Sequence, residues 1–524
     1  MKFFDFFKRK AVVERREPSF RSYAGAAGGR QFSDWRASTT SADTELKQSL
    51  RVLRNRSRSL VRDNCYARRC KALFQNNIVG QGIGMQMVRQ NESGQRMDDE
   101  NERTELAWWD WAMSTGCHTG GVLSLTDILR LMIGEVYETG EVLVRFVPKK
   151  FGDSKVPLAL EVIEAERIVE HEKSITLRSG HTVRMGIECD EWGRPVAYWC
   201  YRGHPGDSSS FRGFNSHDHI RIPADECVHL YRCDRWPQHR GEPWLSSVLK
   251  RLRDVGEYTN SEMVAARAAA NIMGFFKRPD EGISDNDDDD DQDAFKMEPG
   301  MIWKLRDGES FEGFSPARPN GALDPFLRFM VREVATGVGV SYESLSKDYS
   351  KSNYSSSRLS ILDDRQAFRV LQQWVIRVFL FPLFRQWFRQ ASLAGVIRIK
   401  DAASAEDEWL HACRFRPPGW SWVDPTKEIA AAIAAVQAGF TTVGDVISLN
   451  GGGTDPEDIF KARRKELDLL ESLGLEFSTS TPVASPQAET EKTDESEEVE
   501  ENEAKEGEDT PSSDDGRNAT ATSE

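Results

Sequence analysis

The stretch GVGVSYESLSKDYSKSNYSSSRLS, residues 337–360, contains nine serines, three tyrosines and two lysines. The residues before it, Asp324 to Val338, are predicted to form an apolar helix, and those from Arg358 to about Leu393 a longer one. Between these helices almost no side chain could fill a hydrophobic core. Polar segments of this kind are usually surface loops, so a more specific role needs support from the rest of the chain.

The length of 524 residues allows roughly two to four domains or one elaborate fold with a large core. No apolar run of about 18 residues, the length that spans a bilayer, is present. The nearest candidate, Val375 to Phe384, is interrupted by Arg377 and Pro382. The N-terminus, MKFFDFFKRKAVVERREP, has too short an apolar stretch for a secretory signal. We therefore expect a soluble chain with no membrane span, made inside the cell.

The net charge of −15 is unevenly distributed along the chain. The residues from Ser478 to the end carry 15 acidic and 3 basic side chains, and the run from Asp280 to Asp293 adds nine acids without a base. The remainder of the chain has a net charge of +6. Eight Arg or Lys residues accompany one Asp between Arg51 and Lys71. A basic helix face is usually solvated, but it also suits a phosphate or an acidic partner.

Metal sites are not favoured by the sequence. The aspartates at 285–293 lack the spaced ligands and the turn glycine of an EF-hand loop, so a solvated acidic insert is the preferred interpretation. The eight cysteines include no CxxC pair. Cys227 and His229 would share one face of a strand, with Cys233, His217 and His219 near in sequence, but no second pair has zinc spacing. Free thiols and no metal are predicted.

Motifs of catalysis are also missing from the sequence. GQGIG at 80–84 is followed by neither the Lys nor the helix start of a phosphate-binding loop, and its glycines need only backbone freedom. No GxSxG, no HExxH and no catalytic carboxylate pair stands out. We therefore predict a protein that is not an enzyme and needs no cofactor.

Hydrophobic periodicity predicts helices in the first third of the chain, over Thr44 to Asn77, Asn101 to Met113 and Leu125 to Glu138. Ser124 is the expected N-cap of the third. Strand-like alternation then predicts a mostly antiparallel region with strands at 140–148, 158–168, 181–190, 194–201 and 227–232.

Helices return in the second half. A long helix is predicted from Pro243, and Pro382 should kink or break the helix that contains it. Three short helices are predicted between Thr426 and about Leu473, with Gly439 and Gly451 as stops. The residues after them are rich in Glu, Asp, Ser and Thr and are predicted to be disordered. The pattern indicates an α+β protein with an acidic tail.

The order of these segments resembles the lambda-like family of portal proteins of tailed bacteriophages. SLVRDNCYARRCKALFQNNIVGQGIGMQ (59–86) resembles the family's N-terminal helix and turn, and HLYRCDRWPQHRGEPWLSSVLKRL (229–252) the entry to its first stem helix. GVGVSYESLSKDYSKSNYSSSR (337–358) is similar to its inner loop, and DPTKEIAAAIAAVQAGFTTVGDVI (424–447) to its crown opening. Each motif is weak alone, but four in order, across about residues 45–473, are specific.

The resemblance implies the portal fold, in which a mixed helical and β wing, a two-helix stem, a small clip containing strands, a kinked long helix and a helical crown follow one another. The implied parts are a basic arm (1–42), the wing (43–240), the first stem helix (241–274), the clip (275–320), the second stem helix (321–340), a tunnel loop (341–357), the long kinked helix with the wing return (358–423), the crown (424–475) and a disordered acidic tail (476–524).

The resemblance also implies which residues meet partners. The tunnel loop would line a channel for double-stranded DNA, through Ser341, Tyr342, Lys347, Tyr349, Ser350, Lys351, Ser352, Asn353 and Tyr354. The clip would meet the terminase and the adaptor proteins, through Met301, Trp303, Lys304, Arg306, Phe311 and Phe314. This role would explain the polar segment between two helices. A polar loop suits a water-filled channel, where weak contacts with phosphates let DNA slide.

The expected function is therefore that of a portal protein, a homo-oligomer of twelve copies in the virion, at one capsid vertex, assembled in the host cytoplasm. It would nucleate head assembly with the major capsid and scaffold proteins, dock the terminase, conduct DNA without sequence specificity, and bind head-completion and tail proteins. Arg51 to Lys71 would then lie at a subunit interface, in solvent or near packaged DNA. The alternatives are a DNA-processing enzyme, such as a nuclease or motor subunit, and a monomeric nucleic-acid-binding module.

Overall fold

The structure is a computed structural model that describes residues 39–91, 93–170, 175–207, 218–271, 274–277, 310–313, 321–351, 353–398, 402–450 and 456–475. The chain divides into two compact units, one ending at Pro456 and the other beginning at Glu457. The predicted basic arm up to residue 38, the acidic tail, the aspartate run and Gly451 lie outside the described residues.

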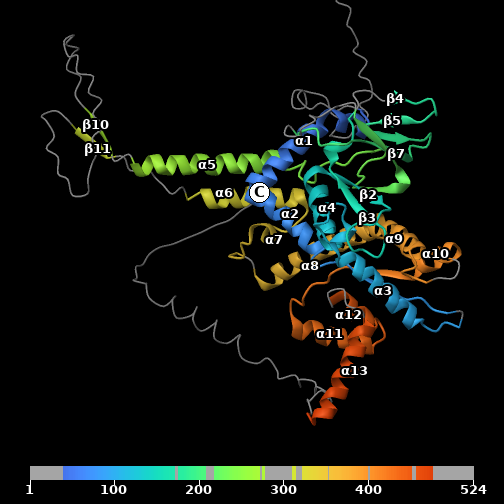
Figure 1. Ribbon diagram of the computed structural model, residues 1–524. Helices are drawn as coiled ribbons and strands as arrows, with labels where there is room; N and C mark the ends of the chain where they lie inside the picture. The colour runs from blue at the N-terminus through green and yellow to red at the C-terminus, as the bar shows by residue number, and fades with distance from the viewer. Residues whose placement is uncertain are drawn as a thin grey trace, which may run out of the picture. The chain divides into compact units, whose positions relative to one another are not determined.

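Helices and strands alternate along the chain, in agreement with the predicted α+β class (Figure 1). The helices are α1 (Ala42–Asp63), α2 (Cys65–Ile78), α3 (Asp98–Met113), α4 (Leu125–Thr139), α5 (Leu249–Asn271), α6 (Leu323–Val338), α7 (Tyr342–Ser346), α8 (Tyr354–Val375), α9 (Phe381–Leu393), α10 (Ala402–Ala412), α11 (Pro425–Gln437), α12 (Val443–Asn450) and α13 (Pro456–Leu473). The strands are β1 (Gly84–Met87), β2 (Glu141–Val147), β3 (Ala159–Ile163), β4 (Ile175–Thr176), β5 (Thr182–Arg184), β6 (Ile187–Cys189), β7 (Pro195–Tyr201), β8 (His219–Pro223), β9 (Cys227–Tyr231), β10 (Gly274–Lys277), β11 (Ser310–Gly313) and β12 (Cys413–Arg416).

Local signals account for the helices near the N-terminus. The helix predicted over 44–77 is interrupted at Asn64, whose side chain accepts hydrogen bonds from the N–H groups of Tyr66 and Ala67 and so caps α2. The predicted cap Ser124 is confirmed, because its hydroxyl oxygen accepts from the Asp127 N–H in a reciprocal capping box. α2 and α4 pack together through Phe74 and Tyr137, whose ring centroids are 5.4 Å apart.

The predicted antiparallel strands form two sheets. The first has the order β3-β2-β9, and the second has the order β4-β5-β6-β7-β8. The strand predicted over 181–190 is in fact a hairpin, since Met185 (φ 45°) and Gly186 (φ 82°) reverse the chain between β5 and β6. Strands β4, β8 and β12 were not predicted. β12 pairs with β1, which is more than 300 residues away along the chain.

The long helix predicted from Arg358 to Leu393 is continuous through Pro382, where a kink or break was expected. A short π-helical turn, Ile376–Leu380, precedes α9, and Pro382 lies in the first turn of α9. Pro382 has no N–H to donate to the preceding turn, and the wider π-helical turn accommodates its ring. Among the described residues, Tyr354–Leu393 is long and apolar enough to cross a membrane. Its large apolar side chains, such as Phe379 and Trp387, are however buried in the main core.

The helix predicted from Pro243 begins instead at Leu249. Residues 244–248 form turns, in which the Ser246 N–H donates to the Pro243 carbonyl at 2.9 Å. Beyond them α5 runs beside α6 (Figure 1), and Tyr258 meets Phe326 with a centroid separation of 4.9 Å. The predicted helix at 324–338 corresponds to α6, and the three short C-terminal helices correspond to α11, α12 and α13.

Candidate functional site

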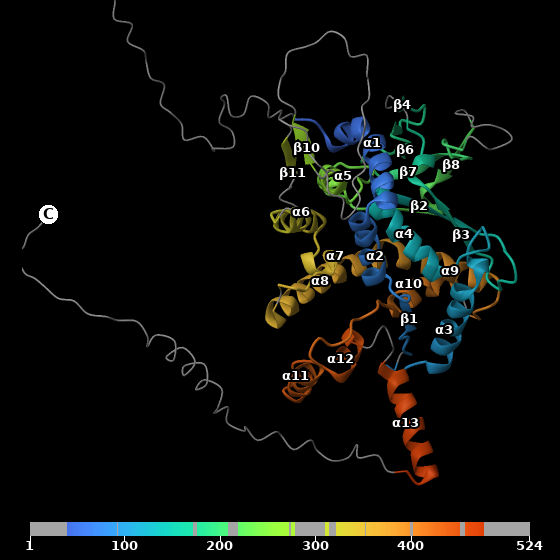
Figure 2. The ribbon, with the colours of Figure 1, turned by 90° about the vertical axis from the view of Figure 1, so that its left-hand side faces the viewer.

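The polar segment 341–357, predicted as a loop, contains the short helix α7 and the first turn of α8 (Figure 2). Asp364 of α8 holds the start of α7. Its Oδ1 accepts from the Ser341 N–H at 2.8 Å, and its Oδ2 accepts from the hydroxyls of Ser341 and Ser344, each at 2.6 Å. The buried Asp364 carboxylate thus satisfies the N-terminus of α7.

Asp348 organises the turn after α7. Its carboxylate accepts from the Ser350 hydroxyl at 2.6 Å, from the Ser350 N–H at 3.1 Å and from the Tyr342 hydroxyl at 2.9 Å. Arg328 of α6 lies 3.5 Å from the same carboxylate. The hydrogen bonds from Ser350 lower the pKa of Asp348 to about 2. Lys347 occupies the left-handed region at φ 62°, which ends α7.

The start of α8 is tied to the segment before α11. Asn353 caps α8 by accepting from the Ser356 N–H at 2.8 Å. The Tyr354 hydroxyl donates to Asp424 at 3.3 Å, and Arg358 forms an ion pair with Glu428 at 3.1 Å. The polar segment is therefore held at both ends by side chains of its own chain.

The predicted channel residues differ in exposure. Ser341 and Tyr342 are half-buried within the hydrogen-bond network, and Ser352 lies outside the described residues. The other predicted channel residues are exposed, namely Lys347, Tyr349, Ser350, Lys351, Asn353 and Tyr354. Sequence reasoning missed the three anchors Arg328, Asp348 and Asp364. A local signal was available only for Asp348, because an aspartate two residues before a serine can accept from the serine N–H in a turn.

Five of the six predicted clip residues lie outside the described part of the chain. Met301, Trp303, Lys304, Arg306 and Phe314 lie outside the described residues. Phe311 belongs to β11, where it is the antiparallel partner of Phe276 in β10. Their roles remain a prediction.

A second polar centre lies in the protein interior and was not foreseen. The fully buried Glu141 carboxylate accepts from Arg54, from Arg240 at 2.8 Å and from the Gly241 N–H at 2.8 Å. Burial alone would raise the pKa of Glu141, but Arg240 and Arg54 hold it well below the usual value. We call Arg54, Glu141, His229, Arg240 and Gly241 the buried charge cluster.

His229 completes this cluster rather than a metal site. Burial lowers the pKa of His229, so the ring is neutral and its Nε2–H donates to Glu141 over 3.0 Å. The thiol of Cys227, on the same strand, lies 3.4 Å from the Pro223 carbonyl oxygen. Cys227 and His229, which the sequence placed on one face of a strand, are thus engaged in contacts with Pro223 and Glu141.

Basic side chains of the segment 51–71 form hydrogen bonds and ion pairs with other parts of the same chain. Arg54 joins the buried charge cluster, and the Arg69 guanidinium donates to the Ser344 carbonyl at 3.3 Å. Lys71 pairs with Glu138. Arg54, Arg69 and Lys71 therefore hold α1 and α2 to neighbouring segments of the same chain. For this basic segment the sequence had suggested a solvated face, a subunit interface or contact with DNA.

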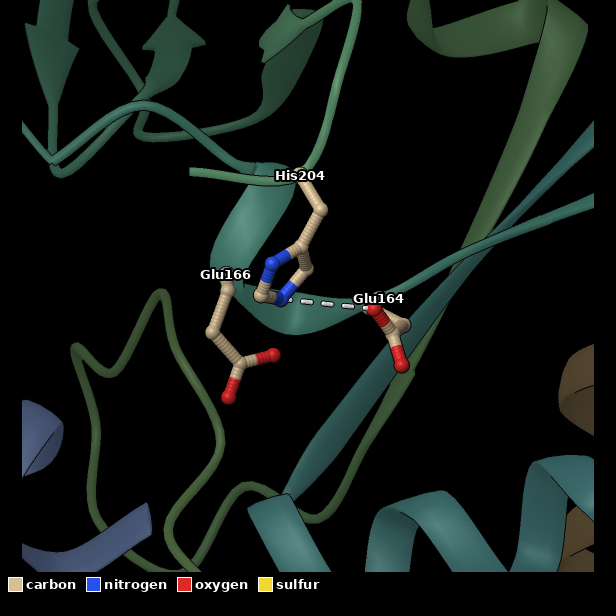
Figure 3. Close-up of side chains that lie close together, drawn as sticks. All are labelled: Glu164, Glu166 and His204. Atoms are coloured by element: carbon tan, nitrogen blue, oxygen red, sulfur yellow. Dashed lines mark ion pairs between the residues drawn. The ribbon is translucent and has the colours of Figure 1, made fainter. Parts of the chain in front are cut away.

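Glu164, Glu166 and His204 bring three possible ligand atoms within 4.8 Å of one another (Figure 3). His204 Nδ1 accepts from the Gly206 N–H at 3.0 Å, so the ring proton is on Nε2, which faces Glu164 at 3.4 Å. A coordinating nitrogen needs a free lone pair at that position. Arg58 also compensates the two carboxylates, at 2.9 Å from Glu166 and 3.7 Å from Glu164. The group is an ion-pair network.

Comparison with known proteins identifies the family of the chain. Residues 28–372 match the family described as phage portal protein, lambda family. The chain is 30% identical over 483 residues to a probable portal protein of Halomonas phage phiHAP-1, covering 89% of this chain and 90% of the relative. It is 21% identical over 513 residues to portal protein B of Escherichia phage lambda, covering 87% and 92%.

A solved structure titled as the neck of an empty GTA particle has a TM-score of 0.40 with 15% identity, covering 75% of this chain and 93% of the other. The family match and the Halomonas phage relative define the class as phage portal proteins, structural components of the virion at the capsid vertex. The chain belongs to the lambda family of these proteins.

Proposed function

We propose that copies of this chain form a closed ring, of about twelve subunits as the family resemblance implies, and that the polar segment 341–357 faces the central channel. The observation that carries the proposal is the exposed surface from Lys347 to Tyr354, which is held in place by Asp348, Asp364 and the α8 contacts. It is polar, contains two lysines and lies in the turn between α7 and α8.

This chemistry suits a sliding polymer. Serine and tyrosine hydroxyls can donate to phosphate oxygens without reading bases, and Lys347 and Lys351 attract the backbone. Each such contact is weak and depends on salt. A pre-organised surface of this kind would guide double-stranded DNA and let it move in either direction.

The remaining steps follow from the same proposal. The region around β10 and β11 would meet the terminase during packaging and the head-completion and adaptor proteins afterwards. The chain would also contact the major capsid and scaffold proteins during head assembly. The chain would supply no catalytic group, so the energy of DNA movement would come from the terminase.

The first test is the assembly state of the purified full-length chain, measured by native mass spectrometry with negative-stain images. A closed ring with a central hole is the expected result. A chain that stays monomeric even when it is co-produced with capsid and scaffold proteins would overturn the proposal.

The second test addresses the channel face. The double variant Lys347→Glu/Lys351→Glu should form rings with unchanged yield but retain less full-length DNA in filled heads, because like charges repel the phosphates. Lys150→Glu, at an exposed position of a distant loop, is the matched control. Equal DNA content in all three preparations would argue against a channel role for the segment.

A further inference from the structure

Helix α11 contains no buried residue. Ile429 is 46% exposed, Ile433 is 52% exposed, and Phe440, just after the helix, is 87% exposed. Between Glu428 and Asp445 the chain has no charged residue at all. A helix face that meets water normally carries charged and polar side chains. α11 is therefore incomplete in a single chain.

One side of α11 is attached to its own chain. Glu428, Ala432 and Ala435 are half-buried and recur at helical spacing. On this side Glu428 pairs with Arg358, and Asp424, just before the helix, accepts from Tyr354. These contacts join α11 to α8, and the described residues leave most of the two sides that flank the attachment exposed.

These two flanks differ in size. With about 100° between successive residues, a large flank and a small flank lie on opposite sides of α11, each about a quarter-turn from the attached side. The large flank consists of Ile429 and Ile433, with the half-buried Val436 at its edge toward the attached side, and the small flank consists of Ala431, Ala434 and Ala438. The three alanines are exposed, as are both isoleucines.

We propose that the large flank of α11 in one copy packs against the small flank of α11 in the next copy around the ring. The inference rests on the proposed ring and names one of its contacts. Alanines permit two helices to approach closely, and branched side chains fill the space between them. Because the faces are neutral, identical helices meet without like-charge repulsion.

The opposite placement of the two flanks favours a head-to-tail contact. In such an arrangement each copy offers one surface to its left neighbour and another to its right, and the series closes into a ring. Pairing two large flanks would instead give a two-fold dimer, in which both alanine flanks remain exposed to water.

Cross-linking separates these arrangements. The background carries Cys65→Ser and Cys233→Ser, since the other six cysteines are buried. Ile433→Cys and Ala434→Cys are then introduced into separate chains, because two adjacent thiols in one chain would be joined to each other. Rings assembled from each variant alone and from an equal mixture of the two are treated with a short bis-maleimide. The mixture should give covalent dimers on a denaturing gel, whereas each variant alone should remain monomeric.

Other outcomes would overturn the proposal in distinguishable ways. Dimers from Ile433→Cys alone would show pairing of two large flanks. Intact mixed rings without cross-links would show that the two flanks of α11 do not meet between neighbouring copies, while the ring itself stands. A background chain that forms no ring in native mass spectra would contradict the ring, and the α11 contact with it.

Charge insertion gives an independent measurement. Ile433→Glu and Ala434→Glu should each lower the fraction of chains in rings by at least about tenfold, equivalent to about 1.4 kcal/mol. The far-UV circular dichroism of the monomer should not change, because neither side chain is buried. Val122→Glu, at a position 72% exposed before α4, is the control. Unchanged ring yield in both α11 variants would contradict the packing.

Discussion

The buried charge cluster and the polar segment 341–357 are both organised by carboxylates that accept several hydrogen bonds, but they differ in exposure to water. In the cluster, two guanidinium groups, an imidazole and a backbone N–H converge on one carboxylate, and almost no atom reaches water. In the polar segment, carboxylates hold serine and tyrosine hydroxyls beside exposed lysines. Burial makes the first a fixed junction of the fold, and exposure leaves the second available to a ligand.

The cluster also joins parts of the fold that are far apart in sequence. Arg54 comes from α1, Glu141 from β2 and His229 from β9, and Arg240 donates to the carbonyl of Met185, between β5 and β6. Replacing one member leaves several partners without compensation, whereas the polar segment can exchange a lost hydrogen bond for water. The comparison therefore predicts a graded set of stability effects.

The largest effect is expected for Glu141→Gln. A neutral amide leaves two buried guanidinium groups without their anion, so the free energy of unfolding should fall by about 3–5 kcal/mol. Urea titration of the purified chain, followed by circular dichroism, measures the loss. The control is Glu191→Gln, at an exposed turn position. Similar midpoints for the two variants would contradict the role given to the cluster.

Gly140→Ala tests the tight chain crossing beside the cluster. A Cβ on Gly140 would lie 2.3 Å from the carbonyl carbon of Glu242, and φ there is +95°. Steric overlap of this kind costs about 1–3 kcal/mol. Gly180→Ala is the matched control, because Gly180 has φ +86° with no atom within 4 Å of the added Cβ. Both variants place an alanine at positive φ, so the difference between their urea midpoints measures the steric overlap at Gly140 alone. Equal midpoints would contradict the predicted overlap.

Asp364→Asn tests the anchor of the polar segment. The amide cannot accept all three hydrogen bonds from Ser341 and Ser344, and unfolding free energy should fall by about 1–3 kcal/mol. Hydrogen exchange should rise first in α7. The neighbouring Asp363, an exposed residue, provides the control variant Asp363→Asn. Unchanged exchange in α7 would mean that Asp364 is not its anchor.

The smallest effect concerns pH. The hydrogen bond with Asp43, 2.6 Å from Nδ1, raises the pKa of His239 to about 9 from an ordinary value of 6.5. Because the folded state binds this proton more tightly, the stabilisation is complete below about pH 6.5 and is lost as the pH rises through 9. Urea midpoints across this window should fall less in His239→Gln than in the unchanged chain, whereas His411→Gln should behave like the unchanged chain. Parallel pH profiles for all three would contradict the assignment.

The sequence by itself determined the local elements. Helical periodicity located α3, α4 and α6, the Ser124 cap marked a helix start, and alternation located most strands of the two sheets. The polar character of 341–357 was also visible, and with three other stretches it indicated the portal family. These features depend on neighbours within a few positions along the chain, which a linear sequence displays directly.

Only the tertiary structure decided which distant groups meet. It placed Glu141 between Arg54 and Arg240, formed α7 through the carboxylate of Asp364, and paired β1 with β12. It also showed which side of α11 is attached and which flanks remain uncovered. The physical reason is that a buried ion pair or a strand register depends on the distance between segments in space, and residue type alone does not contain that distance.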